Sequence, residues 1–80
     1  MLSDTGALRD ILSRRDPHGY YVIPARPEAW DLVSPLSGRD GVVIVEYGDV
    51  ILVKTRSRSL ASRIARMLAS RGLLALEDEI

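Results

Sequence analysis

The chain contains no cysteine, asparagine or glutamine, and its only histidine is His18. The absence of cysteine excludes disulfide bonds and any zinc site built from thiolates. One histidine does not make a histidine-rich site, so we expect no metal and no cofactor. A chain of 80 residues forms one domain and buries only about 60–65% of its unfolded surface. Such a domain must therefore gain stability from tight packing or from a second subunit.

The side chains most prone to chemical damage are nearly absent, since methionine occurs only at Met1 and Met67. This bias is typical of proteins that work at high temperature, and we interpret it as indicating a thermophilic source. Chance in a short chain is the alternative. Arginine outnumbers lysine ten to one, which we attribute to a GC-rich genome.

Long hydrophobic runs are also lacking. The longest aliphatic runs, at residues 42–45 and 50–53, fall far short of the roughly 20 residues that cross a bilayer. The first residues offer neither a basic segment nor an apolar segment of a signal peptide. We therefore expect a cytoplasmic protein that does not bind membranes.

Apolar periodicity and turn residues predict a single α+β domain over residues 1–80. The expected order begins with a helix at 4–15, a strand at 20–23 and a short helix at 27–34. Two strands at 42–46 and 50–55, joined by a turn, follow. The chain then forms a helix that begins at a cap, Ser57 or Ser59, and ends at Gly72, and a last strand at 73–76. This order is the ferredoxin-like βαββαβ arrangement preceded by a helix. It predicts a four-stranded antiparallel sheet with both crossover helices on one face.

The central hairpin is apolar on both faces, whereas a sheet with one wet face should alternate polar and apolar residues. Val43 and Val45 point to one side and their neighbours to the other, and Val50 and Leu52 alternate likewise on the return strand. The second face therefore needs a cover. The cover is either the N-terminal helix, through Leu8, Ile11 and Leu12, or a second copy of the chain. We favour a homodimer that associates through Val43, Val45, Val50 and Leu52.

Residues 54–71 carry six basic side chains and no acid, so the formal charge of the remainder is −6. Arginines at a helix start oppose the helix dipole unless an anion binds there. We therefore consider an anion or nucleic-acid site made of Arg56, Ser57, Arg58 and Ser59 and extended by Arg63 and Arg66. The alternative is an ordinary solvated helix face whose arginines pair with the acids at 77–79.

Other polar residues suggest little chemistry. Glu46 and Asp49 flank the hairpin turn and His18 lies in another turn, but no catalytic motif surrounds them. Either tyrosine of the first strand could stack a base, although the neighbouring strand offers no second aromatic. We expect Trp30 and one of these tyrosines to be core residues, and we expect that the protein is not an enzyme.

The strand–helix unit at 48–68 resembles the small dimerisation subunit of the archaeal KEOPS tRNA-modification complex. The likeness lies in the Thr/Ser-rich lead-in at 54–59 and in Leu60, Ile64 and Leu68 of the following helix, and it covers roughly a quarter of the chain. The N-terminal helix and the segment 24–35 are not part of that pattern. The resemblance implies a dimer that holds partner proteins on tRNA. Together with the hairpin, it favours a non-catalytic interaction or scaffold module, with nucleic-acid or phosphate binding as the alternative.

Overall fold

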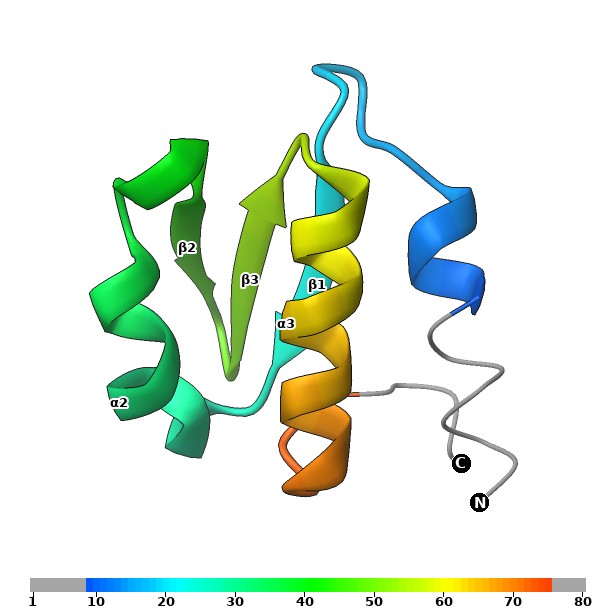
Figure 1. Cartoon of the computed structure of the whole chain (residues 1–80). Helices are drawn as coiled ribbons and strands as arrows, with labels where there is room; N and C mark the ends of the chain where they lie inside the picture. The colour runs from blue at the N-terminus through cyan, green and yellow to red at the C-terminus, as the bar shows by residue number, and fades with distance from the viewer. Residues whose placement is uncertain (1–8, 76–80) are drawn as a thin grey trace.

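The computed structural model describes residues 9–75 and shows an antiparallel sheet with helices packed on one face (Figure 1). The strands are β1 (Tyr21–Ala25), β2 (Val43–Tyr47) and β3 (Val50–Thr55), in the spatial order β1-β3-β2. The helical elements are residues 9–13, the 3-10 turns η1 (Pro27–Ala29), η2 (Ser34–Leu36) and η3 (Arg39–Gly41), and the α-helices α2 (Trp30–Val33) and α3 (Arg58–Ser70). The predicted α+β class is confirmed.

The hairpin of β2 and β3 closes through a two-residue turn, Gly48 and Asp49. Tyr47 faces Val50 across it, so β2 runs one residue further than the sequence predicts. Gly48 has φ 61° and occupies the first central position, where type II′ hairpin turns favour glycine. This turn fixes the register of the two strands and thereby decides which side chains share a face.

The core lies between the sheet and the helices. Alternate residues of β1 and β3 are buried there: Tyr21, Ile23, Ala25, Ile51, Val53 and Thr55. Helix α3 lies over this face in Figure 1 and buries Ala61, Ile64, Ala65 and Leu68 against it. Leu60 and Met67, expected in the same apolar stripe, are only partly buried. A fully buried large aliphatic side chain contributes roughly 1.5–3 kcal/mol to this packing.

Helix α3 begins and ends at residues whose local chemistry explains both boundaries. Ser57 is the N-cap, and its Oγ accepts a hydrogen bond from the Leu60 amide at 3.2 Å. Past the other end, Gly72 takes φ 70° and lets the Leu73 amide donate back to the Leu68 carbonyl at 2.8 Å. Of the two serines considered as the cap, Ser57 therefore fills the role.

The ferredoxin-like prediction of a fourth strand is only partly matched. Leu74 forms a single antiparallel bridge with Ala25, and the amide of Ala75 donates to the carbonyl of Pro24. A continued ladder would need a backbone N–H from Pro24 in return, and proline has none. Within residues 9–75 the sheet is therefore three-stranded, and residue 76 of the predicted strand lies outside the described residues.

The short helix expected at 27–34 is present as η1, α2 and the start of η2, but it buries different side chains from those expected. Ala29 and Val33, four residues apart, face the core, and Trp30 is displaced outward with 42% of its surface exposed. The expectation that Trp30 is a core residue is therefore wrong. The α-helix ends at Val33, and the chain then tightens into the 3-10 turn η2, which contains Pro35.

The N-terminal helix ends at residue 13, earlier than the predicted end at residue 15. Residues 9–13 are helical, whereas 14 and 15 are not, and the predicted part at 4–8 lies outside the described residues. This segment contacts the first turn of α3, because Arg58 donates to the carbonyl of Leu12 at 3.4 Å. It lies beside α3 at the β1 side of the molecule (Figure 1).

Candidate interaction surface

The face of the sheet turned away from α2 and α3 is almost entirely apolar. We call it the open face. The pairing Val45↔Leu52↔Pro24 lies at its centre and the pairing Tyr47↔Val50 at its hairpin end. Its residues are Val22 and Pro24 of β1, Val43, Val45 and Tyr47 of β2, and Val50, Leu52 and Lys54 of β3. The register thus brings Val43, Val45, Val50 and Leu52, predicted as self-association residues, onto one surface.

The open face is most exposed along β2, which is an edge strand. Val43, Val45 and Tyr47 are 40%, 38% and 71% exposed, and they account for three of the four large hydrophobic side chains exposed among the described residues. Single exposed hydrophobic residues are ordinary, but a contiguous apolar patch marks an interaction surface. Sequence reasoning missed Tyr47, which it placed in the turn.

The N-terminal helix does not cover this face in the described part of the chain. Ile11 and Leu12 pack against the core cluster on the side of α3. Arg15, just after the helix, lies over the ring of Tyr21, a residue that points into the same core. Leu8, the third residue considered for the cover, lies outside the described residues.

A polar cluster bounds the open face at the end opposite the hairpin turn. Lys54 approaches the Asp16 carboxylate at 3.6 Å, and both side chains are largely shielded from water. The same carboxylate accepts hydrogen bonds from the backbone amides of Tyr20, at 2.8 Å, and of His18, at 2.9 Å. The hydrogen bond from the Tyr20 amide has the largest effect and lowers the pKa of Asp16 below its ordinary value of 3.8. Burial opposes this effect, and the His18 amide and the charge of Lys54 lower the pKa further.

The lowered pKa of Asp16 predicts how the stability of the fold depends on pH. Since the pKa of Asp16 is lower in the folded state, its carboxylate stabilises the fold fully above pH 3.8, and the contribution disappears as the pH falls through the folded-state pKa. Asp16→Asn keeps an acceptor oxygen but loses the charge. We expect wild type to have a higher melting temperature than Asp16→Asn at pH 6 and the gap to narrow below pH 3.8, as followed by circular dichroism. A gap that widens in acid would contradict this assignment.

The arginines of the basic stretch, residues 54–71, include some that contact other described residues and some that do not. Arg56 stacks on the ring of Tyr20, 4.6 Å from its centroid, and its Nε donates to the carbonyl of His18 at 3.3 Å. The side chain of Ser57 caps α3 and lies 3.3 Å from the Oγ of Ser59. Arg58 donates to the N-terminal segment. An anion at this helix start would therefore share or displace contacts that the chain already makes.

Arg63 and Arg66 are exposed on α3, away from its buried side. Neither forms an ion pair with another described residue, since the two salt bridges within residues 9–75 are Arg14 with Asp10 and Lys54 with Asp16. Within residues 9–75, these two arginines are the members of the predicted set for which an external anion would displace no hydrogen bond or ion pair.

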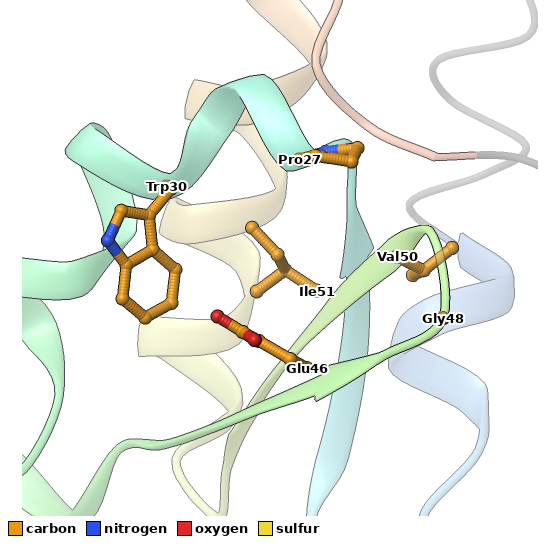
Figure 2. Close-up of a pocket in the computed structure, with 6 residues that line it drawn as sticks. All are labelled: Pro27, Trp30, Glu46, Gly48, Val50 and Ile51. Carbon is orange, nitrogen blue, oxygen red and sulfur yellow. The ribbon is translucent and has the colours of Figure 1, made fainter.

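A shallow hollow of about 210 Å³ lies between α2 and the hairpin (Figure 2). Its lining residues are Pro27, Trp30, Glu46, Gly48, Val50 and Ile51. The Glu46 carboxylate points toward the indole of Trp30 in this view, and no other ionisable group lines the hollow. Asp49 is not part of it, and His18 lies past the far end of β3, beside Arg56. The three side chains considered for acid–base chemistry are therefore not brought together.

Within residues 9–75, no three histidine, aspartate or glutamate side chains gather in a way that could hold a metal ion. The helices of this part of the chain are too short or too polar to cross a membrane. In comparisons with known proteins, no family model, no curated protein and no solved structure matches this chain.

Proposed function

We propose that this protein is a small, non-catalytic interaction module in which a second copy of the chain packs against the open face. The observation that carries the proposal is the row of exposed apolar side chains along the edge strand, Val43, Val45 and Tyr47, which continues into Val50 and Leu52 of the neighbouring strand. Burial of these apolar side chains against a second surface would contribute free energy that the single chain in water lacks.

A second copy suits this surface for reasons of size and symmetry. An 80-residue domain lacks the large core that makes longer chains stable alone. Most homodimers use one patch on both subunits, and the apolar centre formed by Val45 and Leu52 requires no complementary charge from its partner. Two antiparallel sheets packed face to face are a common solution for such surfaces.

Sedimentation velocity on the purified protein at roughly 1–100 µM tests this proposal. We expect a species of twice the 8.9 kDa chain mass that gives way to monomer on dilution. A monomer throughout this range, with a folded circular dichroism spectrum, would overturn it.

Binding of a nucleic-acid backbone is the second candidate function. It is supported by Arg63 and Arg66, which lie one turn apart on the exposed side of a helix that carries no acid. Lysine and arginine contacts to phosphates release counterions, so the affinity of such a complex falls steeply with salt.

A salt titration separates this candidate from the first. We expect replacement of both Arg63 and Arg66 by alanine to reduce the slope of log affinity against log salt by about 1.4–1.8, the loss of two phosphate contacts. The matched control removes Arg26 and Arg39, two exposed arginines outside the basic stretch, and should leave the slope unchanged. This function would be excluded if the two double variants changed the salt slope equally, or if the wild type bound neither RNA nor DNA at ~50 mM salt.

We also propose that the architecture is ferredoxin-like, with a minimal fourth strand and a preceding helix. The bridge between Leu74 and Ala25 supports this arrangement, because it lies on the edge of β1 that β3 leaves open. The split βαβ topology places its last strand at that edge.

A further inference from the structure

The hollow between α2 and the hairpin combines one exposed aromatic ring with one carboxylate. Trp30, the single tryptophan of the chain, has 42% of its surface exposed, so its indole is open to solvent. Glu46 extends from β2, and in Figure 2 its carboxylate points toward the six-membered ring of the indole, whereas the indole nitrogen lies on the far side of the ring. Pro27 and the buried Ile51 add apolar surface to the lining.

Glu46 occupies a position of β2 that the strand pattern would leave to an apolar residue. It pairs with Ile51 across the hairpin, on the face of the sheet that the helices cover, and Ile44 precedes it on the same face. Within residues 9–75, the carboxylate of Glu46 forms no ion pair. An inward-pointing charge on an edge strand discourages pairing with the strands of other molecules, and this role would need no ligand.

The segments on either side of the hollow carry charge of one sign. Residues 27–33 and 46–51 contain no lysine or arginine. They contain four exposed acids, Glu28, Asp31, Glu46 and Asp49. Residues 1–8 and 76–80, outside the described part of the chain, also contain no lysine or arginine. A basic side chain that enters the hollow therefore comes from another molecule.

We propose that this hollow binds an arginine side chain of a partner protein. A guanidinium is planar, stacks on the face of an indole and pairs with a carboxylate through parallel N–H donors. Trp30 and Glu46 offer these two contacts from different elements around one hollow, and Pro27 and Ile51 offer apolar surface to the methylene stem of the arginine. The ammonium of lysine is more strongly hydrated and lacks the planar fork, so the site favours arginine.

This inference goes beyond self-association and is independent of it. Among the described residues, the hollow and the open face share only Val50, because Trp30 and Glu46 lie on the helical side of the sheet. A dimer formed through the open face therefore leaves the indole and the carboxylate exposed to a further protein. Sequence reasoning missed the site, since it considered Glu46 for acid–base chemistry and expected Trp30 in the core.

Titration of the isotope-labelled full chain with Nα-acetyl-arginine methylamide, followed by NMR, tests the site. The single tryptophan gives one indole N–H signal, which reports on the hollow directly. We expect this signal and the amide signals of Gly48 and Ile51 to shift saturably, with a dissociation constant of roughly 1–10 mM because the hollow is shallow. The citrulline derivative has the same shape without the charge and should bind about fivefold or more weakly. The lysine derivative should also bind more weakly than the arginine derivative.

Variants separate the contribution of the carboxylate from that of the ring. Glu46→Gln keeps the shape of the side chain without its charge and should weaken binding about fivefold. Trp30→Leu keeps an apolar residue but removes the ring, and should weaken binding severalfold, as read from the Gly48 amide. The matched control Asp49→Asn removes an acid of the same hairpin that does not line the hollow, and should change the affinity less than about twofold.

The proposal would be wrong if the arginine and citrulline derivatives bound equally, if the lysine derivative bound more tightly, or if Glu46→Gln and Asp49→Asn weakened binding equally. It would also be wrong if the wild type showed no saturable shift up to about 50 mM ligand, and Glu46 would then serve only to protect the sheet edge. Sedimentation velocity identifies the partner. If Glu46→Gln removed a dimer that the wild type forms, the arginine would belong to a second copy and the assignment to another protein would be overturned.

Discussion

Replacement of Leu68 by alanine should destabilise the domain more than any other single truncation in α3. Leu68 is fully buried in the core that also includes Ile23, Val33 and Val53. Removing a buried leucine side chain costs about 2–5 kcal/mol, because the lost transfer free energy adds to that of the cavity left behind. A domain of this length has roughly 4–12 kcal/mol in total, so Leu68→Ala should lose a large share of it.

Guanidinium unfolding followed by circular dichroism measures this loss, at one fixed protein concentration because self-association would add to the stability. Met67→Ala is the matched control, since it truncates the preceding residue of the same helix, which is only partly buried. We expect it to cost less than about 1.5 kcal/mol. Equal losses in the two variants would mean that α3 does not bury the side observed here.

The features predictable from the sequence are those that neighbouring residues decide. The alternation of Val43 and Val45 with the residues between them fixes the faces of β2 once the turn is known, and Gly48 marks that turn. The spacing of Ile64 and Leu68 likewise identifies the buried side of α3. In each case the repeat of the element, two residues in a strand and 3.6 in an α-helix, decides which face a side chain is on.

The features that were not predictable depend on contacts between distant segments. The missing N–H of Pro24 matters only because Ala75 comes to lie beside it, and within residues 9–75 the fourth strand is limited to one bridge. Trp30 is exposed because the side of the helix that packs on the core carries Ala29 and Val33. Contacts of Arg58 with Leu12 span most of the chain, and no local pattern indicates them.

Val45→Lys should dissociate the proposed dimer while leaving the monomer folded. Val45 lies at the centre of the open face, opposite Leu52, and it is 38% exposed in the single chain. A lysine there can reach water in the monomer but would be buried between two apolar faces in the dimer, where an unpaired charge is strongly disfavoured. We expect the dissociation constant to rise about 100-fold or more, equivalent to roughly 2.7 kcal/mol.

Glu46→Lys provides the matched control, because it places the same side chain one residue further along β2 on the opposite face. Sedimentation velocity should therefore give a dimer for Glu46→Lys and a monomer for Val45→Lys, with similar circular dichroism spectra. If both variants remained dimeric, the second copy would bind elsewhere than on the open face. If Glu46→Lys alone became monomeric, the contact would lie on the side of the sheet that carries Trp30, and the helical face would be the interface.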